Sequence, residues 1–382
     1  MTFEMTAQKT FLPNADSVYT FQWDKIADLP SQIPGQPNLG LAGPIAGIID
    51  NQLFIAGGAN FPDSPPWVGG LKKYHDKIYI LKKSKPNHYV WSDMITDHLP
   101  EPVAYASVVS IPQGLVSIGG ENDRGCTKSV RLFKIKKNKL KVKNFPDLPL
   151  PITSSGAVVI KKKIFVAGGI SDDRPLNILF SLDVSKKEME WVELDTMPVA
   201  LSHAVVVVQN DGVEDCIYVI GGRHRCPGQD FTTFSDKIFI YSPSKKSWKM
   251  TDMITSDGQK IKLAAGTGVP FGCDEIVIFG GDQGDIYHKI EDFNNKLASP
   301  DYPNKEVLLQ DKVKLLTSHP GFCRDIFVYN TVSGICNKVG EIPAYAQVTT
   351  LAFYWEKEIV IPNGEIKPGI RTPALMSIKM SK

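Results

Sequence analysis

Six short apolar segments, each ending in a glycine step, constrain the fold of this chain more than any other feature. Five of the segments end in Gly-Gly and the last ends in Asn-Gly. The first residues of these pairs stand at positions 57, 119, 168, 221, 280 and 363, so the intervals are 49 to 62 residues until the last, which is 83. Self-similarity at a nearly fixed period is typical of a protein built from repeated structural units. The chain therefore contains six related units.

A second marker recurs in phase with the glycine pairs. In five units an apolar residue and a proline precede the glycine step, at positions 29–30, 99–100, 148–149, 197–198 and 342–343. A unit of about 50 residues with a strand, a glycine pair and then aromatic residues is typical of kelch-type propeller blades. Two independent markers in one phase make a chance repeat a poor explanation.

Each unit divides into four short strands. In the third unit we expect strands at residues 156–160, 164–167, 178–184 and 191–194. Short, evenly spaced strands with glycine and proline between them favour an all-β repeat array over alternating β and α elements. We predict an all-β fold, a six-bladed kelch-type β-propeller.

The C-terminal end of the chain is one strand short of a complete sixth blade. After Glu365 there is room for one strand at 374–379, and we expect the missing outer strand at 19–26. Trp23 in that segment stands where other units carry an outer-strand tryptophan, namely Trp91, Trp191 and Trp248. Pairing the N-terminal strand with the last blade removes an open sheet edge and ties the termini together. Residues 1–18 are then an N-terminal arm, and residues 19–382 form a single propeller.

The long last interval predicts an insertion. Between Asp282 and Asp325 the chain holds about 25 to 30 residues more than a blade of this period needs. The segments 286–297 and 305–316 carry apolar residues with helical spacing. We expect a helical insertion at 283–325, between the fifth and sixth blades and on the face of the candidate site. It is either a lid that excludes water from the site or a helical hairpin without such a role.

Charge and composition argue against several function classes. The chain has 43 basic and 41 acidic residues and a net charge of +2, which provides no broad field for nucleic acid. No apolar stretch approaches the ~20 residues of a membrane span, so no membrane association is expected. The first residues lack a signal-peptide pattern, which predicts a cytoplasmic location, or a periplasmic one if a leader was removed. The six cysteines show no CxxC spacing and the seven histidines no ligand cluster, so we expect reduced thiols and neither a metal nor another cofactor.

Propeller geometry concentrates function on one face of the ring. The loops after the glycine pairs and the connections that enter the inner strands open on this face, around the axis. Loops with polar side chains around an axial funnel predict a site for a small molecule. The candidate substrate-binding residues are Asn60, Tyr105, Glu121, Arg124, His203, Arg223 and Asn363. Hydrogen bonding between blades also uses such residues, and for any one of them alone this structural role is the commoner explanation.

The sixth unit carries the most specific motif. Residues 363–372 read Asn-Gly-Glu-Ile-Lys-Pro-Gly-Ile-Arg-Thr, which resembles the NGEAKPGLRT signature of the bacterial N-acetylneuraminate epimerases, also called sialic acid mutarotases. The resemblance extends over nearly the whole propeller, with similar segments at 46–59, 70–73 and 104–121. The order of units differs, because the signature stands last here and mid-chain in the familiar epimerases. The chain looks like a cyclically permuted branch of this family, which a closed ring tolerates.

The resemblance implies a reaction and two catalytic residues. The glutamate of the signature, the general base of the family, corresponds to Glu365, and its arginine corresponds to Arg371. The implied reaction interconverts the α and β anomers of a 2-keto sugar acid. Glu365 would take the proton of the anomeric hydroxyl, and Arg371 would hold the carboxylate of the substrate. The sequence departs from the epimerases at Val103 and at 68–69, where they carry Arg and His-Glu.

Other points stay open from the sequence alone. The group that protonates the ring oxygen is not identified, and position makes Tyr105, His203, Arg124 and Arg223 candidates. A kelch scaffold that binds another protein would use the same fold without catalysis. A copper oxidase on such a propeller would need converging His and Tyr ligands, which the sequence does not suggest. The expected partner is a small-molecule sugar acid, and whether the protein forms a homo-oligomer is left open.

Overall fold

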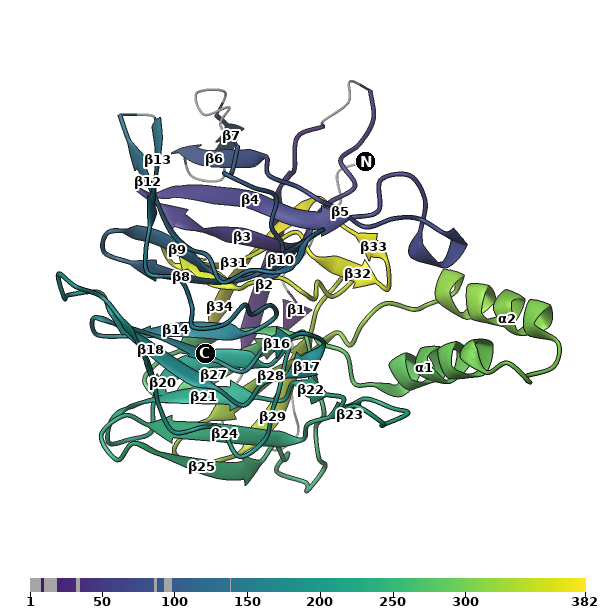
Figure 1. Ribbon diagram of the computed structural model, residues 1–382. Helices are drawn as coiled ribbons and strands as arrows, with labels where there is room; N and C mark the ends of the chain where they lie inside the picture. Colours follow the sequence, from purple (N-terminus) through teal and green to yellow (C-terminus); the bar gives the residue numbers. More distant parts are fainter. Residues whose placement is uncertain (1–7, 10–18, 32–34, 86–87, 93–97, 138) are drawn as a thin grey trace.

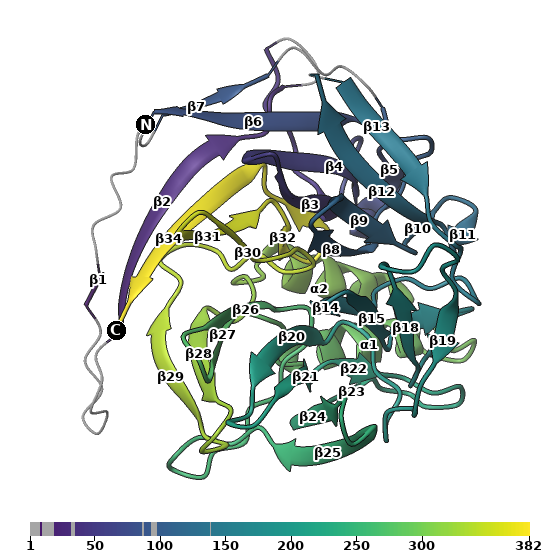
Figure 2. The ribbon, with the colours of Figure 1, turned by 90° about the vertical axis from the view of Figure 1, so that its left-hand side faces the viewer.

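The computed structural model describes residues 8–9, 19–31, 35–85, 88–92, 98–137 and 139–382. Six antiparallel sheets of four main strands stand around a central axis, as Figure 1 shows from the side and Figure 2 from one face. The predicted six-bladed kelch-type propeller is therefore confirmed. Each blade runs outward from its inner strand, which lies at the axis.

The first three blades follow one another along the chain. Their strands, from the axis outward, are β3 (Ala42–Ile49), β4 (Gln52–Asn60), β6 (Ile78–Lys85) and β7 (His88–Trp91); β8 (Ser107–Ile111), β9 (Gly114–Ile118), β12 (Val130–Lys136) and β13 (Lys139–Asn144); β14 (Gly156–Ile160), β15 (Lys163–Ala167), β18 (Leu179–Asp183) and β19 (Trp191–Glu193). The two-residue strand β5 (Lys73–Tyr74) pairs with the end of β4. The four strands expected in the third unit match to within two residues at each end.

The last three blades include the ring closure. Their strands are β20 (Val205–Asn210), β21 (Asp215–Ile220), β24 (Lys237–Ser242) and β25 (Ser247–Asp252); β26 (Thr267–Phe271), β27 (Glu275–Phe279), β28 (Asp325–Asn330) and β29 (Cys336–Glu341); β30 (Phe353–Trp355), β31 (Glu358–Pro362), β34 (Ala374–Ser381) and β2 (Thr20–Asp28). The short strand β1 (Gln8–Lys9) pairs with β2 outside the sixth blade. The rest of the predicted N-terminal arm lies outside the described residues.

The N-terminal strand closes the ring as expected. β2 pairs antiparallel with β34 from Thr20 opposite Ser381 to Asp28 opposite Ala374, and the two strands run side by side in Figure 2. Its apolar residues Phe21 and Trp23 are buried in a cluster with residues of the fifth blade. The closing strand thus fills the space between the fifth and sixth blades as well as covering a sheet edge.

Trp23 is expected to contribute more to stability than any other residue of the closing strand. Its side chain is 4% exposed, and its ring meets the ring of Phe279 edge-on with 5.9 Å between centroids. Replacing a buried Trp with Ala typically costs about 3–5 kcal/mol through lost burial and the cavity left behind. We expect Trp23→Ala to lower the free energy of unfolding by that amount in a denaturant titration. A change below about 1 kcal/mol would mean that β2 does not seal the ring.

The glycine pairs have a common role in contacts between blades. The first glycine of each pair has a left-handed φ of 62° to 66°, and Asn363 takes the equivalent position with φ 51°. At Gly119, for example, a Cβ would lie 2.3 Å from the carbonyl oxygen of Ile152, which accepts the N–H of Gly120 at 2.8 Å. Asparagine tolerates left-handed backbone better than most residues. This explains why the sixth unit keeps the repeat geometry without its first glycine.

The predicted insertion consists of two helices, α1 (Asp285–Ala298) and α2 (Lys305–Thr317). They lie between β27 and β28, the second and third strands of one sheet, so the insertion is inside the fifth blade and not between the fifth and sixth. The connection is long enough to reach past the rim of the ring, and both helices project from one face (Figure 1). Neither helix, nor any other in the described part of the chain, is long and apolar enough to cross a membrane.

Candidate active site

The residues that directly follow the glycine pairs occupy equivalent positions in successive blades. In five blades the backbone of this residue makes two hydrogen bonds to one residue of the loop that leads into the inner strand of the same blade. The pairs are Glu121 with Ala104, Ile170 with Thr153, Arg223 with Ser202, Asp282 with Ala264 and Glu365 with Val348. In four of these blades a short hairpin begins there: β10 and β11 (Glu121–Asn122, Gly125–Cys126), β16 and β17 (Ile170–Ser171, Arg174–Pro175), β22 and β23 (Arg223–His224, Thr233–Phe234), β32 and β33 (Glu365–Lys367, Ile370–Arg371). Figure 1 shows these hairpins on the face that carries α1 and α2.

A cavity of about 310 Å³ lies over the fourth, fifth and sixth blades. Its polar lining comes from Arg223, Asp282, Lys312, His319, Thr349 and Glu365. Apolar side chains of both helices and the short 3₁₀ helix η1 (Pro66–Val68) complete its wall. The helical insertion therefore lies over the candidate site, which is the position that the predicted role of a lid requires.

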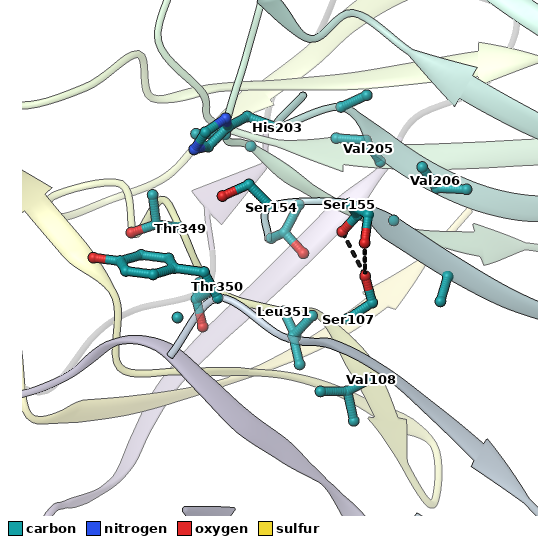
Figure 3. Close-up of a pocket in the computed structure, with 18 of the residues that line it drawn as sticks. Ser107, Val108, Ser154, Ser155, His203, Val205, Val206, Thr349, Thr350 and Leu351 are labelled. Carbon is teal, nitrogen blue, oxygen red and sulfur yellow. Dashed lines mark hydrogen bonds between the residues drawn. The ribbon is translucent and has the colours of Figure 1, made fainter. Parts of the chain in front are cut away.

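A closed ring of backbone hydrogen bonds lies between this cavity and a second cavity on the axis of the propeller. One residue from each blade donates its N–H to the carbonyl of the preceding blade at 2.7 to 3.1 Å, and all six have φ between 51° and 60°: Gly43, Tyr105, Ser154, His203, Ala265 and Thr349. Below it lies an axial cavity of about 190 Å³, whose lining includes His203, Thr349 and the hydrogen-bonded pair Ser107 and Ser155 (Figure 3). The ring holds the bridged residues above it at fixed positions around the axis.

Glu365 lies in the wall of the covered cavity with a defined orientation. Its Oε1 accepts the backbone N–H of Gly369 at 2.6 Å and lies 3.4 Å from Nη1 of Arg371. The side chain is 16% exposed. Both contacts fix the orientation of the carboxylate. The tight turn from 365 to 371 thus fixes the position of this carboxylate in the cavity wall.

Arg371 lies behind Glu365 and does not line the cavity. Its side chain is 5% exposed, and its guanidinium stacks on the ring of Phe61 at 4.6 Å. Nε and Nη1 are buried without a hydrogen-bond partner in the described structure. Tyr105 lies close enough that Arg371 lowers the pKa of its phenol, although burial dominates and raises that pKa overall. Arg371 thus contacts Glu365 directly and contributes no surface to the described cavity lining.

Arg223 provides a cation in the cavity itself. Its guanidinium lies 4.7 Å from the centroid of the Tyr287 ring of α1, and its Nη2 lies 3.4 Å from Nε2 of His203. Burial, together with the charge of Arg223, holds the pKa of His203 well below its usual value. His203 is therefore a neutral imidazole at neutral pH, placed in the ring below the cavity.

Asp282 and His319 are two further polar residues of the lining. The carboxylate of Asp282 accepts the N–H of Gly284 at 2.9 Å, yet burial raises the pKa of this side chain above its usual value. His319 is 5% exposed and accepts the N–H of Gly321 on Nδ1 at 3.0 Å. Burial lowers the pKa of His319, so the neutral ring carries its proton on Nε2.

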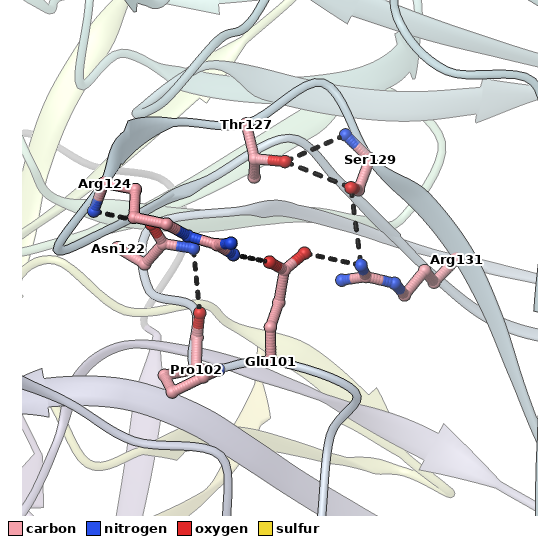
Figure 4. Close-up of polar contacts among 7 residues, drawn as sticks. All are labelled: Glu101, Pro102, Asn122, Arg124, Thr127, Ser129 and Arg131. Carbon is pink, nitrogen blue, oxygen red and sulfur yellow. Dashed lines mark hydrogen bonds and ion pairs between the residues drawn. The ribbon is translucent and has the colours of Figure 1, made fainter.

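Two of the sequence-predicted residues are held in ion pairs outside the cavity lining. Glu121 accepts a hydrogen bond from Tyr74 at 2.8 Å and one from Lys72 at 3.2 Å. Burial and this bond to Glu121 raise the pKa of Tyr74 to about 12. Arg124 pairs with Glu101, which also binds Arg131 at 2.5 Å, in the network of Figure 4.

Two more of these residues are buried within the blades. Asn60 is 5% exposed, donates to the carbonyl of Gly40 at 2.9 Å and contacts His75 at 2.8 Å. Asn363 is fully buried and donates to the carbonyl of Pro373 at 3.0 Å. Of the nine residues predicted from the sequence, Glu365 and Arg223 line the cavity, Arg371 supports Glu365, and Tyr105 and His203 lie in the ring below.

The sequence did not single out several residues of the lining. Trp67, Tyr287, Lys312 and His319 come from η1, the helices and the segment after them. No repeat marks these positions, because the helical insertion and η1 each occur in one unit only. Asp282 did carry a signal, since it follows the fifth glycine pair as Glu365 follows the sixth.

The amino-acid sequence was compared with those of known protein families. The chain matches the family described as N-acetylneuraminate epimerase over residues 8–142 and 145–382. It belongs to the N-acetylneuraminate epimerase family. The match includes the segment 363–372 that forms the wall of the cavity, so the family resemblance stated from the motif is confirmed.

Relatives in this family are similar at modest identity. The N-acetylneuraminate epimerase of Salmonella typhi is 25% identical over 232 residues, 60% of this chain and 56% of its own length. The epimerase of Haemophilus influenzae strain PittEE is 24% identical over 247 residues, 65% of this chain and 61% of its own length. The alignments thus span less than two thirds of these relatives. The solved structure of YjhT is 16% identical with a TM-score of 0.60, covers 92% of this chain and all of its own, and supports the propeller fold.

Proposed function

We propose that this protein is an isomerase that interconverts the α and β anomers of N-acetylneuraminate or a related 2-keto sugar acid. The observation that carries the proposal is the position of Glu365. This residue of the family motif lies in the cavity wall with its carboxylate held by Gly369 and Arg371. Family membership and the names of the relatives support the substrate class.

The lining of the cavity suits a sugar acid. Arg223 and Lys312 are cations that can bind a carboxylate, and arginine does so through two parallel hydrogen bonds. Trp67, Tyr287 and Phe322 provide apolar and aromatic surface for the carbon skeleton of the sugar. Since Arg371 contributes no surface to the described lining, we assign the substrate carboxylate to Arg223 and give Arg371 the role of positioning the base.

The reaction needs a base at the anomeric hydroxyl. Glu365 takes that proton as the bond from the anomeric carbon to the ring oxygen breaks, which produces the open-chain ketone. Rotation about the adjacent carbon–carbon bond presents the other face of the carbonyl, and return of the proton from Glu365 accompanies ring closure to the other anomer. The helices α1 and α2, which line the cavity, limit the access of water to the reacting groups.

Proton NMR of anomer exchange tests the proposal. The α anomer of N-acetylneuraminate is released from a glycoside, and its conversion to the β anomer is followed with wild-type protein and with buffer alone. We expect conversion with the protein to be faster than the spontaneous reaction at every substrate concentration tested. Equal rates with and without protein, for N-acetylneuraminate and for a panel of other ulosonic acids, would refute an epimerase function.

A further inference from the structure

We propose that Asp282 is the general acid of this site, which protonates the ring oxygen as the sugar opens and takes that proton back as it closes. The inference rests on the proposed function and assigns the one chemical role that Glu365 leaves vacant. General acid catalysis at the leaving oxygen typically contributes 10²–10⁴-fold to such a step.

The repeat symmetry of the ring places Asp282 in the blade next to that of Glu365. Glu365 and Asp282 occupy equivalent positions in neighbouring blades, each directly after the glycine step. Each backbone is fixed by two hydrogen bonds of 2.8 to 2.9 Å to the strand entry of its own blade, at Val348 and Ala264. Both side chains line the same cavity of about 310 Å³. A sugar bound in this cavity can therefore contact two carboxyl groups whose backbones are each held by two hydrogen bonds.

The other candidates for the acid are less suitable. Arg223 remains protonated throughout the accessible pH range and does not transfer a proton. His203 is neutral, and Arg124 is paired with Glu101 away from the cavity. Tyr105 lies beside Arg371 outside the described cavity lining, and burial raises the pKa of its phenol. His319 lines the cavity but is neutral, so its remaining Nε2 proton is a poor acid. Among the titratable side chains of the described lining, which also include Tyr287 and Lys312, Asp282 is the one carboxyl group besides Glu365, and a carboxyl is a stronger acid than a phenol or an ammonium group.

The surroundings of Asp282 favour the protonated acid. Burial raises its pKa most strongly, and the N–H of Gly284, Arg223, His319 and His288 act in the opposite direction without cancelling the effect. Two carboxyl groups with different environments are a common arrangement for an acid and a base in one site. Because the acid must be protonated, the enzyme-catalysed rate should fall as pH rises through the pKa of Asp282 in the folded protein.

The proton and electron balance closes without a co-reactant. On opening, the O–H electron pair of the anomeric hydroxyl forms the carbonyl double bond, and its proton goes to Glu365. The electron pair of the broken ring bond goes to the ring oxygen, which receives the proton of Asp282. On closure the hydroxyl attacks the carbonyl, Asp282 regains its proton, and Glu365 returns its own to the carbonyl oxygen. The site ends in its starting protonation state.

The test compares Asp282→Asn with wild type by NMR anomer exchange of N-acetylneuraminate. Asparagine keeps an acceptor for Gly284 but cannot transfer a proton, so we expect a loss of roughly 10²-fold or more in the catalysed rate. The dissociation constant for the sugar acid, from isothermal titration, should stay within about threefold of wild type, because binding and proton transfer are separate steps. Glu275→Gln is the matched control: Glu275 is a buried carboxylate at the far end of β27, and its replacement should leave the rate unchanged.

The outcomes separate the two proposals. A wild type that accelerates exchange together with a fully active Asp282→Asn overturns the role of Asp282 and leaves the epimerase function standing. A wild type that accelerates no sugar acid overturns both. If Asp282→Asn does not fold, the pH profile of wild type decides instead: a background-corrected rate without an alkaline decline overturns the assignment.

Discussion

Replacing Glu365 with glutamine is expected to lower the catalysed rate of anomer exchange by roughly 10²–10⁴-fold, the usual contribution of a general base. The amide keeps the size of the side chain and can still accept the N–H of Gly369, so the turn from 365 to 371 should persist. It cannot accept a proton from the anomeric hydroxyl. The measurement is the rate of α-to-β conversion by NMR at saturating sugar acid, after subtraction of the spontaneous rate.

The control for this variant lies at the start of β31, the strand that precedes the turn carrying Glu365. Glu358 begins β31, pairs with Lys379 at 3.6 Å and lies on the face opposite the cavity, so Glu358→Gln should retain the wild-type rate. The far-ultraviolet circular dichroism of Glu365→Gln should match that of wild type, whereas its thermal midpoint should fall, because the amide leaves the buried Arg371 without its ion-pair partner. A folded Glu365→Gln protein with the wild-type rate would remove Glu365 from the mechanism.

The fold was predictable because it is periodic. Glycine pairs recur where each blade brings its backbone against a carbonyl of a neighbouring connection, and this steric demand leaves a mark in every unit. The closing strand was predictable from Trp23 for the same reason, since an outer-strand position must be filled in each blade. The ring of six left-handed residues could not be predicted, because Gly43, Tyr105 and Ala265 share a backbone conformation and no side-chain type.

The candidate site was predictable only in part. Glu365 was accessible from the motif, whereas the orientation of Arg371 depends on its stacking against Phe61 of another blade. The side chains that α1, α2 and η1 direct into the cavity depend on how the insertion folds back over the ring, which no local pattern specifies. Likewise, Glu121 occupies the same repeat position as Glu365, but its hydrogen bonds to Lys72 and Tyr74 form only in the folded protein, between residues far apart in the sequence. The repeat therefore predicts which residues lie at the face of the ring, and contacts that do not repeat determine which of them line the cavity.

Arg223 is expected to determine the affinity for the acid group of the substrate. Replacing it with methionine keeps most of the apolar stem and removes the charge beside Tyr287. A hydrogen bond to a charged group contributes about 1.5–3 kcal/mol, and each 1.4 kcal/mol is about tenfold in binding. We expect Arg223→Met to raise KM for N-acetylneuraminate roughly 10- to 100-fold with a much smaller effect on kcat, since the carboxylate is bound alike in ground and transition states.

The methyl ester of the sugar acid separates this role from a structural one. Wild type should discriminate against the ester, whereas Arg223→Met should treat the acid and the ester nearly alike, because the charge that distinguishes them has lost its partner. Arg131→Met, which removes an arginine paired with Glu101 outside the cavity, should keep the wild-type preference.

The alternative assignment makes a different prediction: if Arg371 binds the carboxylate, Arg223→Met retains full discrimination and Arg371→Met abolishes it. If instead Arg371 positions Glu365, Arg371→Met lowers kcat for acid and ester together, because a displaced base fails with either substrate.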